Sequence, residues 1–190
     1  MITSSRKTNI QNIYNNIIIT QKIALNIKYI GNNLKQTLER ILIAKNSNKC
    51  INEGYVKSGS IKVLSYSSGK VENKNVIFEV VFECSICSPV EGMLIECKAT
   101  NITKAGIKAE VDENPSPAII FLARDHHSSS EIFNSVEIDN KIKIRVIGQR
   151  FELNDEYISI VGELVEIQNV KKKMKPKSKK NPKLVLVEET

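Results

Sequence analysis

The segment Lys141-Ile-Lys-Ile-Arg-Val-Ile-Gly148 decides the fold of the second half of the chain. Apolar Ile142, Ile144 and Val146 alternate with charged residues, and a period of two is that of a β-strand with one face in a core. The segment therefore predicts a strand whose isoleucine face is buried.

Four neighbouring segments predict the rest of a barrel around this strand. Met93, Ile95, Cys97 and Ala99 share one face of a first strand, which follows a turn at residues 87–92. A long polar connection separates the third strand from the fourth, as in a five-stranded Greek-key barrel of the OB type. We expect this barrel over residues 88–167. Its strands are predicted over residues 93–100, 107–111, 118–122, 141–148 and 157–165.

The first half predicts a smaller unit over residues 17–87, so the whole chain is expected to be α+β and mostly β. Its order is strand, helix, strand, strand. Leu34, Leu38 and Leu42 lie on one face of the helix, and Asn33 is its expected N-cap. The segments are residues 17–25, 34–42, 55–65 and 76–86. Residues 1–16 are predicted to form a flexible arm and residues 168–190 a basic tail.

The formal charge of +7 is unevenly spread along the chain. Residues 1–83 hold 12 Lys and Arg against 5 Asp and Glu, residues 84–166 hold 8 against 14, and residues 167–190 hold 8 against 2. The barrel is therefore acidic between basic flanks. A basic tail can hold phosphate without reading sequence, and the alternative is a solvated, disordered extension.

The sequence gives little support for a membrane or secreted protein, or for an enzyme. No apolar run approaches the ~20 residues of a membrane span, and the start lacks the apolar segment of a secretory signal. We therefore expect an intracellular protein without membrane contact. No phosphate-binding loop, GxGxxG or GxSxG element is present, so no cofactor and no catalysis are predicted.

Four cysteines and a histidine pair are candidate metal ligands. Cys84 and Cys87 form a CxxC, but residues three apart on a strand point to opposite faces, so structural thiols are favoured over zinc. Cys50 and Cys97 are expected to be structural too. In Asp125-His126-His127 the adjacent histidines lack chelating spacing, which favours exposed loop residues or a cap.

Several short segments of the sequence resemble a known protein family. Glu91-Gly92, Arg124-Asp125-His126 and Ile147-Gly148-Gln149-Arg150-Phe151 resemble an S1-type domain, a nucleic-acid-binding OB barrel. Preceded by a unit that carries Gly54-Tyr55-Val56-Lys57-Ser58-Gly59-Ser60-Ile61, the barrel resembles the larger stalk subunit of multisubunit RNA polymerases. The segments look closest to versions from large DNA viruses. The resemblance covers residues 17–167.

The resemblance implies a non-catalytic role. The first domain would be a tip that braces the clamp of a DNA-directed RNA polymerase, and the barrel would guide nascent RNA. The implied partners are the large catalytic subunits, a small helical second stalk subunit and, weakly, nascent RNA. A viral version would act in the host cytoplasm and be packaged in the virion. The implied polymerase-docking residues are Asn26, Tyr29, Gly31, Gly54, Tyr55, Lys57, Gly59 and Ile61.

RNA binding on the barrel would need cations for phosphate and flat side chains for bases. Aromatic residues make up only 5% of the chain and Trp is absent, so a strong stacking platform is not expected. A barrel that serves mainly as a protein-docking surface is the alternative. The candidates are Lys98, Lys104, Lys108, Phe121, Arg124, His126, Arg145, Arg150 and Phe151.

The tail leaves further alternatives open. Its lysines could bind phosphate or form a nuclear localisation patch, and Leu184-Val-Leu-Val187 is a β-prone segment that could add to a sheet edge.

The alternative to a stalk subunit is a free-standing S1 protein in translation or RNA decay. A metal-dependent enzyme that uses the cysteines is a third.

Overall fold

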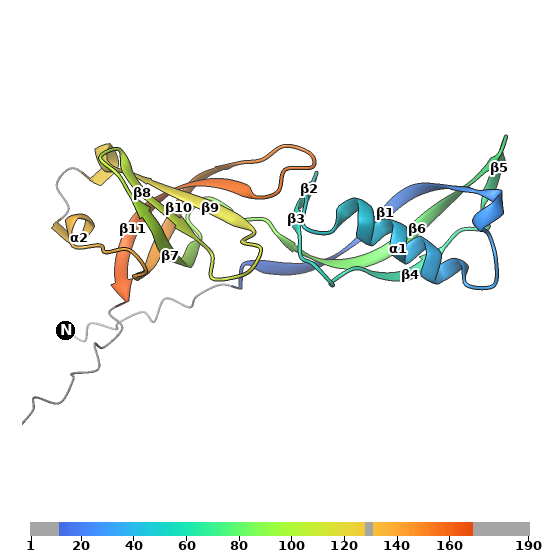
Figure 1. The fold of residues 1–190 in the computed structure, drawn as a ribbon, viewed down its shortest axis with the longest axis horizontal. Helices are drawn as coiled ribbons and strands as arrows, with labels where there is room; N and C mark the ends of the chain where they lie inside the picture. The colour runs from blue at the N-terminus through green and yellow to red at the C-terminus, as the bar shows by residue number, and fades with distance from the viewer. Residues whose placement is uncertain (1–11, 128–130, 169–190) are drawn as a thin grey trace, which may run out of the picture.

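A computed structural model describes residues 12–127 and 131–168. The molecule is elongated, with a sheet-and-helix unit at one end and a barrel at the other (Figure 1). We call the first unit the tip. Residues 1–11 of the predicted arm and the tail from residue 169 lie outside the described residues. The arm predicted over residues 1–16 is wrong at residues 14–16, which belong to the first strand because they pair with residues 85–87.

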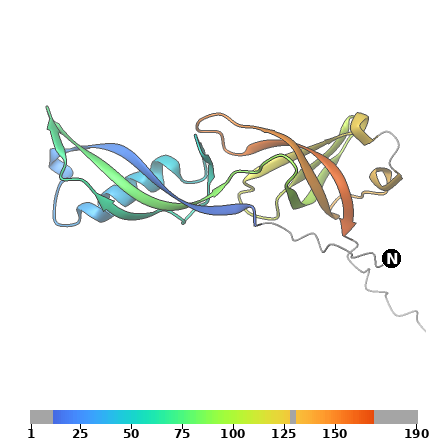
Figure 2. The same ribbon diagram turned by 180° about the vertical axis from the view of Figure 1, so that it is seen from behind.

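Two long strands form the spine of the tip. β1 (Tyr14–Asn26) and β6 (Asn75–Cys87) pair antiparallel over their whole length, from Tyr14↔Cys87 at the barrel to Asn26↔Asn75 at the distal end. Twelve residue steps of about 3.3 Å make this ribbon roughly 40 Å long. The tip therefore has two ends that are far apart (Figure 2).

Short strands cover the other edge of β6. They are β3 (Gly54–Val56), β4 (Lys62–Tyr66) and β5 (Lys70–Glu72), with β2 (Cys50–Ile51) beyond β3. The single strand predicted over residues 55–65 is wrong, because a turn at 57–60 divides it. In that turn the backbone N–H and the hydroxyl of Ser60 both donate to the Lys57 carbonyl.

The predicted helix is confirmed as α1 (Leu34–Asn46). Leu38 and Leu42 are completely buried in the tip core, as their spacing predicted. Asn33 is the N-cap residue of the helix, as predicted, but its side chain makes no capping hydrogen bond. A 3-10 turn, η1 (Ile27–Tyr29), links β1 to the helix at the distal end.

The predicted barrel is confirmed as a closed sheet of five strands. Its order is β10-β11-β9-β8-β7, closed by β10 against β7, and only β9 and β11 run parallel. This is the OB arrangement that the sequence predicted. Ile142, Ile144 and Val146 all face the core with at most 1% exposure. The strands are β7 (Leu94–Ile102), β8 (Gly106–Glu110), β9 (Ala118–Ala123), β10 (Lys141–Arg150) and β11 (Ile158–Gln168).

His127 closes one end of the barrel, within η2 (Arg124–His127) and before the short helix α2 (Glu131–Asn134). The Leu164 backbone N–H donates to its Nε2 at 2.8 Å, so its Nδ1 donates to the Ala123 carbonyl at 2.7 Å. Its ring also stacks on Phe133, with 4.6 Å between centroids. Of the two predicted roles for the histidine pair, His127 has that of a buried cap, whereas His126 is exposed as predicted but lies in the 3-10 helix η2 and not in a loop.

The tip and the barrel are joined by more than the main chain. The Cys50 backbone N–H donates to the Asp155 carbonyl, and the Asn154 N–H donates back to the Cys50 carbonyl, each at 2.8 Å. Tyr55 and Cys87 are buried in the same apolar cluster as the barrel core. The core therefore runs across the boundary predicted at residue 88.

The cysteines are buried, free thiols. Cys84 faces the tip core while Cys87 faces the barrel core, which confirms that the CxxC pair points in opposite directions. Burial raises the pKa of Cys50 and Cys84 to about 11, and of Cys87 and Cys97 to about 12. In residues 12–127 and 131–168 no three His, Cys, Asp or Glu side chains are placed to hold a metal ion. No helix in these ranges is long and apolar enough to span a membrane.

Candidate nucleic-acid interface

A groove of about 580 Å³ runs across the outer face of the barrel. It brings together three of the predicted RNA-binding residues, Lys108, Phe121 and Arg150, from three different strands. The remaining lining residues are Ile119, Gly148, Gln149, Tyr157, Ser159, Ile160 and Val161.

The strand register explains why these side chains meet. Lys108 pairs with Phe121, Phe121 with Val161, and Val161 with Gly148, which makes one row across β8, β9, β11 and β10. Residues opposite one another in a sheet place their side chains on the same face. Gly148 ends the row without a side chain, so the groove stays open beside the half-exposed Phe121 ring.

A second row, two residues along, adds a cation. Arg150 pairs with Ser159, which pairs with Ile119. Arg150 and Lys108 are both held by neighbouring carboxylates, Glu152 and Glu110, at 2.9 Å. These ion pairs are solvent-exposed and worth at most about 1 kcal/mol, so a phosphate can replace the carboxylates.

Tyr157 is the groove residue that sequence reasoning missed. It is 42% exposed and lies just before β11, on the same groove as Phe121. Two rings there can stack two bases, each worth roughly 1–3 kcal/mol. The low aromatic content argued against a stacking platform, but the fold concentrates two rings on one face. Only the position of Tyr157 as the first residue of the strand predicted over residues 157–165 could have indicated this.

Other predicted RNA-binding residues lie outside the groove and are already engaged. Arg124 donates from Nε to the Lys104 carbonyl at 2.9 Å, and its guanidinium lies 5.5 Å from the Phe133 ring centre. Lys98 binds Asp139 at 2.8 Å, and that hydrogen bond raises the pKa of Lys98.

Four predicted residues remain. Arg145 pairs with Glu163 at 3.2 Å. Phe151 is half-buried against the barrel core, whereas Lys104 and His126 are exposed at the end of the barrel near η2. The predicted RNA-binding set therefore contains one group of three in the groove and six residues outside it, of which Lys104, Arg124 and His126 lie together near η2.

The predicted polymerase-docking residues divide between the two ends of the tip. Asn26 accepts a hydrogen bond from the Lys28 N–H at the start of η1, and Tyr29 and Gly31 are exposed beside it. Tyr55, by contrast, pairs with Cys87 at the barrel end, roughly 40 Å away along β6. The predicted polymerase-docking residues therefore do not form one surface.

The residues at the barrel end have structural roles. Tyr55 and Ile61 are buried, and Gly54 packs against the backbone of Cys87. Lys57 binds Glu113 of the barrel at 3.4 Å. Gly59 is exposed in the turn, with φ of +70°. Only Gly59 is fully exposed in this group.

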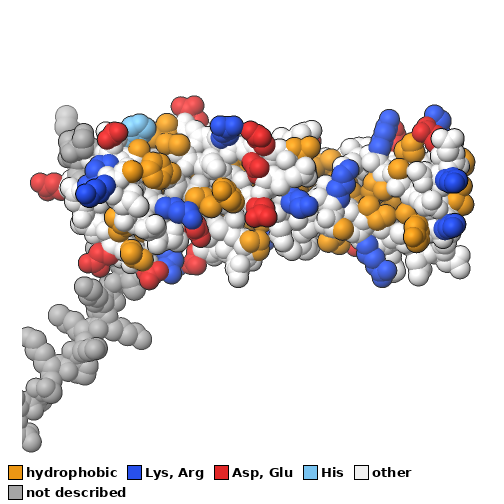
Figure 3. All heavy atoms as spheres, turned by 45° about the horizontal axis from the view of Figure 1, so that its top comes forward, with side chains coloured by type: hydrophobic (Ala, Val, Ile, Leu, Met, Phe, Trp, Pro, Cys, Tyr) orange, Lys and Arg blue, Asp and Glu red, His pale blue; other side chains and the backbone are white. Residues whose placement is uncertain are grey.

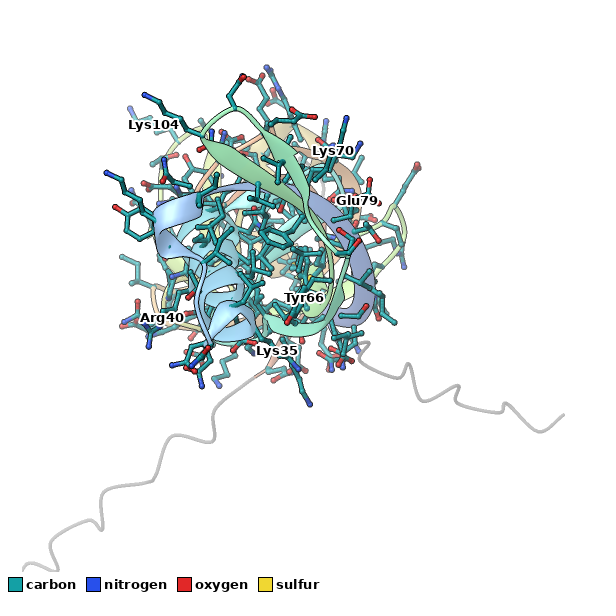
Figure 4. The ribbon with its side chains drawn as sticks, turned by 90° about the vertical axis from the view of Figure 1, so that its right-hand side faces the viewer. Lys35, Arg40, Tyr66, Lys70, Glu79 and Lys104 are labelled. Carbon is teal, nitrogen blue, oxygen red and sulfur yellow. The ribbon has the colours of Figure 1, made fainter. Side chains whose placement is uncertain are left out.

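The distal end of the tip carries an exposed apolar group, which we call the distal tip surface. It consists of Ile27, Tyr29, Ile30 and Val71, with exposures of 37–69%. The Ile27 N–H donates to the Lys74 carbonyl, so η1 and the turn after β5 lie side by side. Lys35, Arg40 and Lys70 point outward around this end (Figure 4).

The two parts of the molecule differ in charge. In the face shown in Figure 3, basic side chains outnumber acidic ones over the tip, whereas both signs are mixed over the barrel. Lys28, Lys35, Arg40 and Lys74 have no carboxylate partner among the described residues. The distal end of the tip therefore combines exposed apolar side chains with cations such as Lys28 and Lys74.

The chain is similar to a known viral protein. The chain is 24% identical over 173 residues to a protein of Acanthamoeba polyphaga mimivirus that is named, provisionally, as a DNA-directed RNA polymerase subunit. The match covers 83% of this chain and 84% of that protein, so it includes both the tip and the barrel. No protein-family model matches the chain.

Proposed function

We propose that this chain is a non-catalytic stalk subunit of a DNA-directed RNA polymerase of a large DNA virus. The observation that carries the proposal is the similarity to the mimivirus protein over four fifths of both chains. A match that extends through the tip and the barrel supports the role of the whole molecule rather than that of an OB barrel alone.

The distal tip surface is the part that docks on the large catalytic subunits and braces the clamp. Exposed apolar side chains such as Tyr29 and Val71, which are 69% and 67% exposed, are typical of a surface that a partner covers. The barrel end of the tip is occupied by the barrel itself. The distal end therefore replaces residues 54–61 as the proposed contact.

The groove with Phe121 and Tyr157 guides nascent RNA. Its two rings face solvent beside Lys108 and Arg150, which is the combination that single-stranded RNA requires. Because Lys108 and Arg150 already pair with Glu110 and Glu152, their contact with RNA phosphates is weak. A weak contact lets the transcript slide as it lengthens.

Affinity purification tests the function. The tagged chain, recovered from the cells in which it is expressed, is expected with stoichiometric amounts of two very large polymerase chains. Tyr29→Ser combined with Val71→Ser should reduce that recovery. Ile18→Ser is the matched control, because Ile18 is 66% exposed on the tip but lies in the middle of β1.

Two results would contradict the proposal. A chain that is monomeric in extracts, without polymerase chains, would identify a free-standing S1 protein instead. If the double variant and the control were recovered equally well with polymerase, the distal tip surface would not be the contact. Immunoblots of purified virions test packaging separately, and we expect the chain to be present.

A further inference from the structure

β1 has an open edge along its whole length. Among the described strands it pairs only with β6, without a register shift, and its 13 residues contain no proline. No backbone N–H of residues 15–26 donates to a group beyond that pairing in the described part of the chain. Long, flat edges are usually blunted by bulges, prolines or a cover. This edge lacks the first two.

A cavity of about 320 Å³ lies at the middle of this edge. Ile19, Thr20 and Gln21 line it consecutively, together with residues of α1 and of the β2–β3 turn. Ile19 and Gln21 face the helix side of the sheet while Thr20 faces the other side, so a cavity that touches all three reaches the strand edge. An added strand would find backbone partners and a pocket for one side chain there.

The chain holds a segment suited to that place. Leu184-Val-Leu-Val187 is aliphatic and β-prone, and the polymerase role leaves it unused. Its tether leaves the barrel near the start of β1, because Gln168 donates to Glu96, and Glu96 shares a cavity with Ile13. Fifteen residues from 169 to 183 span up to about 50 Å, which exceeds the roughly 40 Å of β1.

We propose that Leu184–Val187 adds to the open edge of β1 as an extra strand of the tip sheet. The segment then covers the edge and directs one aliphatic side chain into the cavity beside Thr20. The tether keeps the lysines of residues 171–183 along the tip–barrel junction. This inference does not depend on the polymerase role.

Hydrogen exchange of the intact chain tests the proposal. Val185→Pro removes a backbone donor and should speed exchange of the outward β1 amides about tenfold, as expected if nine tenths of the molecules hold the added strand. Val185→Thr keeps the donor and the β-branched shape, so it is the matched control and should exchange like the unmodified chain. The β1 amides bonded to β6 report that the tip remains folded.

Two outcomes would overturn it. Equal exchange of β1 in the unmodified chain and in Val185→Pro would show that the segment does not cover the edge. Protection that increases with protein concentration, together with a dimer in light scattering, would assign the edge to a second copy of the chain.

Discussion

Gly54 lies so close to Cys87 that any larger residue would overlap the neighbouring strand. A Cβ on Gly54 would collide with the Cys87 carbonyl oxygen and approach Ile86 Cγ2 to 2.8 Å, and its φ of +137° already favours glycine. The close approach holds β3 against the end of β6. It thereby places Tyr55 in the core shared with the barrel.

Gly54→Ala should therefore lower the free energy of unfolding by about 3 kcal/mol, from backbone strain and overpacking together. Gly59→Ala is the control. Its φ is also positive, but nothing lies within 4 Å of the new Cβ, so about 1 kcal/mol is expected. Urea unfolding of both variants measures the difference. Equal losses would show that the contact with Cys87 is not tight.

The buried thiols predict a loss of stability at alkaline pH. The pKa of Cys97 and Cys87 is about 12 in the folded chain, against about 8.5 for a free thiol. Above pH 9 the unfolded chain loses protons that the folded chain keeps. The free energy of unfolding should then fall by up to about 1.4 kcal/mol per pH unit for each thiol, and should not depend on these thiols below pH 8.

Urea unfolding at pH 7, 8 and 10 measures this dependence. Cys97→Ala removes one titrating group and should make the decline between pH 8 and 10 shallower, whatever its effect on stability at pH 7. A decline that is unchanged in the variant would mean that other groups cause it.

The parts that sequence could predict are those set by a strict period. Ile142, Ile144 and Val146 repeat every two residues, and the barrel strand followed as predicted. Residues 55–65 were predicted as one strand, yet a turn at Ser58-Gly59-Ser60 interrupts them, where Ser60 bonds back to Lys57. A turn of this kind is set by local hydrogen bonds, so the spacing of apolar residues does not reveal it.

The candidate sites were harder to predict for a different reason. Phe121 and Tyr157 share a groove only because β9 and β11 are parallel neighbours, although 36 positions separate these rings in the sequence. The docking set failed to form one surface because Tyr55 faces the barrel. Charge and exposure could indicate candidate residues, but only strand order shows which of them meet.

A three-residue cluster holds the tip against the barrel. The Tyr14 hydroxyl donates to Glu113 at 2.9 Å, and Lys57 binds the other oxygen of Glu113 while lying 4.2 Å from the Tyr14 ring centre. Burial raises the pKa of Tyr14 most, and the hydrogen bond to Glu113 raises it further. Tyr14→Phe and Glu113→Gln should therefore be non-additive, with a coupling of about 0.5–1.5 kcal/mol in the free energy of unfolding. Strict additivity would argue that the contact does not form in solution.

The groove predicts which substitutions weaken RNA binding. Phe121→Ala and Tyr157→Ala should each weaken the binding of a short single-stranded RNA by roughly 5- to 150-fold, the equivalent of one stacked base. Arg145→Gln is the control, because Arg145 is a barrel cation outside the groove that pairs with Glu163. Fluorescence anisotropy provides the affinities. A stronger loss in the control than in the ring variants would place RNA elsewhere on the barrel.

The salt dependence of RNA binding separates the tail from the folded body. The groove cations Lys108 and Arg150 are each paired with a neighbouring glutamate. Residues 169–190, in contrast, hold eight lysines against two glutamates. Each phosphate neutralised on a single strand contributes about −0.7 to the slope of log K against log salt, so removal of residues 169–190 should flatten the slope by up to about 6. Removal of residues 184–190 alone keeps every lysine and should leave the slope unchanged. If the longer deletion also left it unchanged, the counterions would be released from the folded body, and the tip cations around Lys35 would become the site to test.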